Sequence, residues 1–246
     1  MLKTSPKEWF AQWFDSPYYH ILYKNRDYAE AELFLHKLID FLNFKKEDKL
    51  LDLACGKGRH SVYLNREGFD VEGVDLSPKS IHNAAQYSNE RLKFAIHDMR
   101  NVYREDSFDY VLNLFTSFGY FKSEEENIQT ICSAASNLKK GGKLLIDFMN
   151  SKKVIADLRP YEEKTLEGIK FIIRKHVEDS HIIKEISFEV EGKMYSFEER
   201  VKAISLDNFL HYFEQANLKC LHIFGDYQLN DFEENSSERL ILICQK

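Results

Sequence analysis

Short uninterrupted apolar runs recur along the first 150 residues and alternate with stretches in which apolar residues return every three or four positions. The uninterrupted runs are typical of buried strands, and the three-to-four spacing is typical of helices. The predicted strands lie at 49–54, 69–75, 92–97, 108–115 and 143–149. Strands that alternate with helices predict an α/β fold, a doubly wound, mostly parallel sheet with helices on both faces.

Local signals place the ends of the helices. Ser77 followed by Pro78 starts one helix, and Ser123 with Glu126 three residues later forms a capping box at the start of another. We expect Gly141 and Gly142 to end that second helix. Further helices are predicted at 29–44, from about Arg59 to Gly68, and at 205–217.

The pattern changes between Ser151 and Ile204. Segments rich in β-branched and aromatic residues follow one another at 169–177, 181–190 and 193–204. A turn at 190–193 joins two of them, which predicts an antiparallel insert of three strands. Two last strands follow the helix at 205–217, at 219–224 and 239–244. We expect the insert, residues 151–204, to roof a pocket above the carboxyl edge of the sheet.

The first strand runs directly into a glycine turn, Asp52-Leu53-Ala54-Cys55-Gly56-Lys57-Gly58. Gly56 and Gly58 permit backbone angles closed to other residues and let a ligand lie against the main chain. A second strand ends in Asp75, 23 residues after Asp52. A carboxylate at that point of a nucleotide-binding unit accepts hydrogen bonds from ribose hydroxyls. Asp52 would repel a pyrophosphate and attract an ammonium group, so a nucleoside with a cationic amino-acid arm is favoured over NAD.

At these residues the sequence resembles the class I, Rossmann-like methyltransferases that use S-adenosylmethionine, of the small-molecule type. Their turn reads D-x-G-x-G-x-G, and Ala54 stands here in place of the first glycine. The resemblance implies seven strands, with the antiparallel last strand between the fifth and sixth. It implies that S-adenosylmethionine is bound, with S-adenosylhomocysteine as product, by Tyr19, Tyr23, Arg26, Asp52, Ala54, Gly56, Gly58, Asp75, Leu76, Asp98, Met99 and Leu114.

Several of these roles are specific. The resemblance implies that Asp98 accepts a hydrogen bond from the adenine amino group and that Met99 lies against the adenine ring. The alternative is that Asp98 is an ordinary acidic residue in the turn after a strand. Tyr19, Tyr23 and Arg26 would share one face of a helix and bind the cofactor carboxylate. The alternative for that aromatic segment, residues 1–28, is packing on the domain. The resemblance implies that residues 29–150 and 205–246 form the methyltransferase domain.

The implied chemistry is in-line displacement of a methyl group from a sulfonium. Phe118 and Tyr120 follow the fourth strand and are predicted to bind the substrate. The sequence offers five candidates for a catalytic base and does not distinguish one of them. His60 lies at the start of a helix, where we expect it to be exposed or to cap the helix. The candidates are His60, His97, Tyr120, His176 and Tyr195.

Charge and cysteine content limit the classes of binding partner and metal site that we expect. The 246 residues carry a net charge of −6, so no basic excess indicates a nucleic-acid partner. No apolar stretch has membrane-spanning length. The four cysteines lack a C-x-x-C pair, which favours reduced thiols in the cytoplasm over a metal site. A small-molecule acceptor is favoured over protein or RNA methylation and over a non-catalytic binding module, while monomer and homodimer stay undecided.

Overall fold

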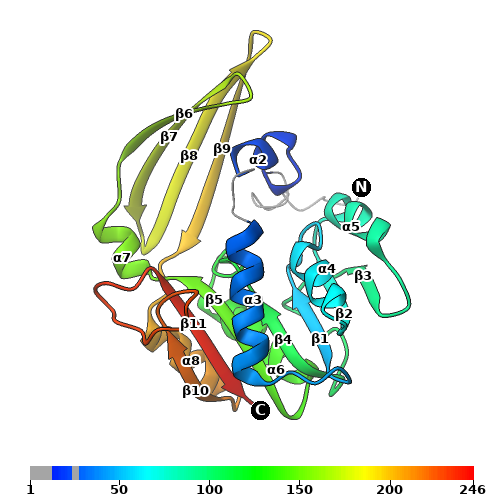
Figure 1. Cartoon of the computed structure of the whole chain (residues 1–246). Helices are drawn as coiled ribbons and strands as arrows, with labels where there is room; N and C mark the ends of the chain where they lie inside the picture. Colours follow the sequence, from blue (N-terminus) through cyan, green and yellow to red (C-terminus); the bar gives the residue numbers. More distant parts are fainter. Residues whose placement is uncertain (1–12, 24–27) are drawn as a thin grey trace, which may run out of the picture. The chain divides into compact units, whose positions relative to one another are not determined.

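The computed structural model describes residues 13–23 and 28–246 and divides into two compact units (Figure 1). Of the described residues, the larger unit contains 28–153 and 204–246, and the smaller unit combines 13–23 with Val154–Ala203. The predicted roles of residues 1–28 as a cofactor cover and of 151–204 as a roof stay predictions. Among the described residues, no helix is long and apolar enough to cross a membrane.

The larger unit is built on a seven-stranded sheet with the order β10-β11-β5-β4-β1-β2-β3. The first five strands of this unit pair in parallel, and β11 runs antiparallel to both β5 and β10. This order confirms the predicted fold, including the position of the last strand. The strands are β1 Lys49–Leu53, β2 Asp70–Asp75, β3 Leu92–Ile96, β4 Phe108–Asn113, β5 Leu138–Met149, β10 Lys219–Phe224 and β11 Arg239–Gln245.

Helices pack on this sheet and start where the capping signals predict. The Ser77 and Ser123 hydroxyls accept hydrogen bonds from backbone N–H groups in the first turns of α5 and α6, and Ser205 does so for α8. These bonds satisfy N–H groups that have no partner within a helix. The helices of this unit are α3 Tyr28–Leu42, α4 Arg59–Arg66, α5 Pro78–Ala84, η1 Ala85–Tyr87, α6 Glu124–Asn137 and α8 Leu206–Gln215, and α7 Ser151–Ala156 begins in the larger unit and ends in the smaller one.

The core of the larger unit follows from the alternation of strand residues. Leu50 and Leu112 are buried against α3 and α4, and α3 crosses one face of the sheet in Figure 1. Their neighbours Leu51 and Val111 are equally buried, and successive strand residues point to opposite faces. Both faces are therefore covered, as continuous apolar runs require.

Two element boundaries differ from the predictions. β4 ends at Asn113, two residues early, because Phe115 and Thr116 adopt left-handed backbone angles with φ of 58° and 59°. β5 begins at Leu138, so Gly141 and Gly142 lie inside a strand and do not end α6. The Gly141 N–H donates to the Lys246 carbonyl, which draws this segment into pairing with the C-terminus.

The smaller unit is a four-stranded antiparallel sheet packed against helix α2, Pro17–Leu22. Trp13, Phe171 and Phe188 are buried together in its core. The sheet has one strand more than predicted, because β6 is a largely charged edge strand without an apolar pattern. The strands are β6 Tyr161–Leu166, β7 Ile169–Glu178, β8 His181–Val190 and β9 Lys193–Lys202.

Candidate cofactor-binding site

The turn after β1 contains three left-handed residues within five positions. Ala54, Gly56 and Gly58 have φ of 60°, 56° and 80°. A Cβ on Gly58 would lie 2.6 Å from the Phe94 ring, whereas a Cβ on Gly56 would meet no atom within 4 Å. Gly58 is therefore required by close packing, and Gly56 faces open space. Ala54 bears a strain that glycine would avoid, of about 1–2 kcal/mol.

Asp75 holds this turn against the end of β2. Its Oδ2 accepts the Gly56 N–H at 2.9 Å, and its Oδ1 accepts the Ser77 N–H at 2.8 Å. A carboxylate can accept several hydrogen bonds at once, so these bonds are compatible with the predicted contact to a ribose hydroxyl. Leu76, next in the chain, is 38% exposed and offers an apolar surface beside it.

Asp52 is buried on β1 and accepts the Ser61 hydroxyl at 2.6 Å. Burial raises the pKa of Asp52 to about 7; the Ser61 hydrogen bond opposes the rise and the charge of Asp75 adds to it. The side chain therefore changes charge near neutral pH. Its predicted pairing with an ammonium group stays a prediction.

The ends of β3 and β4 contribute a second polar group of residues. Arg100 contacts the Asp98 carboxylate and Glu126 at 2.6 Å each, and these bonds from Arg100 lower the pKa of Asp98 against the effect of its burial. Asn113 donates to the Leu53 carbonyl at 3.2 Å and lies 3.8 Å from the Met99 sulfur. Its Oδ1 is buried without a partner in the described part of the chain. Sequence reasoning missed both Arg100 and Asn113.

A buried acid, Asp147, organises the neighbouring loops. Its Oδ2 accepts the Phe115 N–H at 2.8 Å and the Tyr227 hydroxyl at 3.2 Å, and its Oδ1 contacts the Arg239 guanidinium at 2.6 Å. Arg239 also donates to the Thr116 hydroxyl at 3.0 Å. We call these five residues the Asp147 cluster. The lone acid in the apolar run 143–149 was the sequence signal that could have revealed it.

Aromatic stacking extends this cluster to α4. The Phe115 ring stacks on His60 at 4.7 Å, and the Arg59 guanidinium lies 4.8 Å from the same ring. His60 is buried, and the N-cap position of α4 is Gly58 without a side-chain capping bond, so the expectation that His60 is exposed or caps the helix is wrong. Arg59 has only donor groups, so at 3.0 Å it donates to Nε2 of His60, which is an acceptor.

The other predicted site residues lie elsewhere. Tyr23 belongs to the smaller unit and donates to both Glu199 oxygens, at 2.6 and 2.8 Å, and Tyr19 packs on Tyr23 with ring centroids 4.8 Å apart. Helix α2 ends at Leu22, and Arg26 lies outside the described residues. The predicted roles of these three residues in cofactor binding stay predictions.

Three residues follow β4. Leu114 is buried in the core, and Phe118 is buried with its ring 5.6 Å from that of Phe209. The Tyr120 hydroxyl donates to the Thr116 carbonyl. The fold alone accounts for the burial of the Leu114 and Phe118 side chains, so their assigned contacts with ligands stay predictions.

The residues at the carboxyl ends of β1 to β4 suit S-adenosylmethionine. Open space beside Gly56, the carboxylate of Asp75 at the end of β2 and the exposed Leu76 match a ribose and an adjoining base. The unpartnered Asn113 oxygen is an acceptor that a ligand N–H could satisfy. The pairing of Asp52 with a cationic part of the ligand stays a prediction.

Comparison with known proteins agrees with this geometry. A family model described as "Methyltransferase domain" matches residues 50–142. The putative methyltransferase YqeM of Bacillus subtilis is 30% identical over 215 residues, which cover 82% of this chain and 85% of that protein. The dTDP-3-amino-3,4,6-trideoxy-alpha-D-glucopyranose N,N-dimethyltransferase of Streptomyces venezuelae is 35% identical over 101 residues, covering 40% of this chain and 41% of that protein.

A solved structure shares the fold. The crystal structure of an S-adenosylmethionine-dependent methyltransferase from Clostridium acetobutylicum superimposes with a TM-score of 0.78. The superposition covers 93% of this chain and 95% of the Clostridium acetobutylicum chain, at 20% sequence identity.

Replacing Asp75 tests the ribose assignment. Asp75→Ala removes the carboxylate that would accept ribose hydroxyls and that holds Gly56 and Ser77. We expect the dissociation constant for S-adenosylhomocysteine, measured by titration calorimetry, to rise about tenfold or more. Asp70→Ala, at the opposite end of the same strand, should leave it within about twofold. An unchanged constant for Asp75→Ala would refute the assignment.

The buried Asp52 predicts a pH dependence of stability. Because the pKa of Asp52 in the folded protein, about 7, exceeds the ordinary aspartate value of 3.8, the folded state keeps a proton that the unfolded state loses between these values. The free energy of unfolding therefore falls as pH rises from 4 to 7, by about 1.4 kcal/mol per unit of raised pKa. Asp52→Asn keeps an acceptor for Ser61 and lacks this titration. Urea unfolding of both proteins should show a difference that changes with pH; a constant difference would contradict it.

Asp147→Asn tests the Asp147 cluster. The substitution keeps the side-chain size but leaves the largely buried Arg239 without its counter-charge. We expect the free energy of unfolding to fall by about 2–4 kcal/mol in urea titrations. Asp106→Asn, which breaks the exposed pair with Lys246, should cost less than about 1 kcal/mol. Equal losses in the two variants would show that burial of the pair is unimportant.

Proposed function

The chain belongs to the class I family of S-adenosylmethionine-dependent methyltransferases, and on this premise we propose that it transfers a methyl group to a small-molecule acceptor. The observation that carries the proposal is the turn held by Asp75, with open space at Gly56 and ligand acceptors on adjacent strand ends. When bound, S-adenosylmethionine supplies a methyl group on a positively charged sulfur, which needs no covalent activation by the protein.

The chain's own residues bind and orient the reactants. Asp75 accepts the ribose hydroxyls, Asp98 lies at the strand end assigned to adenine, and the backbone at Gly56 allows close approach. Orientation of two reactants alone accounts for large rate gains in such displacements. The Asp147 cluster fixes the loop after β4, which borders the reacting end of the crevice.

Three base candidates are already engaged in hydrogen bonds. Nε2 of His60 accepts from Arg59, and Nε2 of His97 lies 2.8 Å from the Asn101 carbonyl, to which it donates. The Tyr120 hydroxyl donates to Thr116. We assign no catalytic base, and an acceptor with a free lone pair, such as a neutral amine, needs none before the displacement.

Two observations support a small-molecule acceptor. The Streptomyces venezuelae relative is named for the N,N-dimethylation of an amino sugar nucleotide. The net charge of −6 provides no general attraction to nucleic acid. A cytoplasmic location belongs to the same proposal.

The test has two stages. Saturating S-adenosylmethionine or S-adenosylhomocysteine should raise the melting temperature, equivalent to about 2.7 kcal/mol at a hundredfold excess over the dissociation constant, whereas NAD should not. Radiolabelled S-adenosylmethionine should then label small amines but not bulk RNA or protein. A rise of the melting temperature with NAD alone would overturn the cofactor assignment. Labelling of RNA or protein would overturn the proposed acceptor class. Cofactor binding without any methyl transfer would indicate a non-catalytic binding module.

A further inference from the structure

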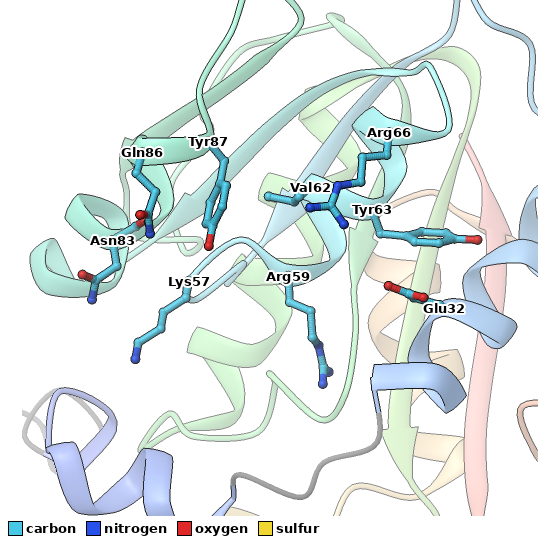
Figure 2. A pocket seen from close by; sticks show the side chains of 9 residues that line it. All are labelled: Glu32, Lys57, Arg59, Val62, Tyr63, Arg66, Asn83, Gln86 and Tyr87. Carbon is cyan, nitrogen blue, oxygen red and sulfur yellow. The ribbon is translucent and has the colours of Figure 1, made fainter.

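A groove of about 380 Å³ opens along helix α4 in the larger unit (Figure 2). The loop after β1 contributes Lys57, α4 contributes Arg59 and Arg66, and the end of α5 with η1 contributes Asn83 and Tyr87. Figure 2 shows Lys57 and Arg59 projecting in the same direction from the loop and the start of α4, with Tyr87 beside Lys57. A volume of this size holds one small molecule.

The groove is basic although the chain as a whole is acidic. Three cations line it, and Glu32 from α3 is the lining carboxylate. Among the residues that the structure describes, Lys57 and Arg66 form no ion pair. Burial and the nearby charge of Lys79 lower the pKa of Lys57. An anion would relieve this repulsion and satisfy donors that the protein leaves unused.

The spacing of the cations indicates an elongated anion. Arg59 and Arg66 are seven residues apart on α4, so they lie on the same face of the helix, about 10 Å apart along its axis. Lys57 lies between Gly56 and Gly58, so this end of the groove adjoins the turn assigned to the cofactor. The Tyr87 ring, 47% exposed, lies beside Lys57 at this end, Asn83 lines the same side of the groove, and Arg66 lies toward the other end (Figure 2).

We propose that this groove binds the nucleoside diphosphate part of the methyl acceptor. The phosphates lie against Lys57, Arg59 and Arg66, and the base stacks on Tyr87 with its edge toward Asn83. Guanidinium and ammonium groups recognise phosphate by charge-assisted hydrogen bonds, and a tyrosine ring provides a stacking surface for any base. The inference rests on the proposed function, because it names the substrate class of the same methyl transfer.

The test measures binding of UDP and dTDP to the full chain by titration calorimetry, with S-adenosylhomocysteine saturating the cofactor site. At least one should bind with a dissociation constant below about 1 mM, a value that corresponds to about 4 kcal/mol. Arg66→Glu should raise that constant about tenfold or more. The matched variant Lys140→Glu, which changes an exposed cation on β5 outside the groove, should stay within about twofold. Equal weakening by both variants, or no saturable binding, would overturn the proposal.

A second variant separates the base from the phosphates. Tyr87→Ala should weaken binding of the nucleoside diphosphate and leave inorganic pyrophosphate binding unchanged; equal effects on both would overturn the base-stacking role. Failure of the groove and failure of the proposed function are distinguishable. Titration with S-adenosylhomocysteine alone tests the proposed function, and nucleotide binding in the unsaturated protein tests the groove. Melting curves confirm that each variant is folded.

Discussion

The candidate site depends on one carboxylate, that of Asp75, which fastens the turn after β1 to the end of β2. The turn includes left-handed Ala54, Gly56 and Gly58, an arrangement that the chain adopts only if other contacts offset its strain. Asp75 provides such contacts by accepting the N–H groups of Gly56 and Ser77. Because parallel strands end at the same edge of the sheet, the groups at the ends of β3 and β4 lie along the same edge.

The turn after β1 places an acidic and a basic residue in opposite environments. Asp52 is buried under the turn and bonded to Ser61, whereas Lys57 is exposed in the groove along α4. A second buried acid, Asp147, is balanced by Arg239 and anchors the loop after β4. Acidic side chains are therefore buried at the strands of the larger unit, and exposed positive charge lies on the adjoining helix face.

Each of the two units closes its own core. The core of the larger unit joins α3 and α4 to the parallel sheet, and that of the smaller unit joins Trp13 and Leu22 to Phe171 and Phe188. In the smaller unit the Trp13 indole and the Tyr23 hydroxyl both donate to Glu199. The described N-terminal aromatic residues thus pack on the inserted sheet.

The sequence by itself determined the parallel sheet, its helix starts, the glycine turn and the acids at the strand ends, because these follow from local periodicity, capping and backbone preference. Only the tertiary structure decided the Asp147 cluster, the stacking of His60 on Phe115 and the cationic groove, since their members are far apart in sequence and meet only when strands and loops assemble. It also decided the start of β5 and the existence of β6, where pairing with neighbouring strands overrides weak local signals.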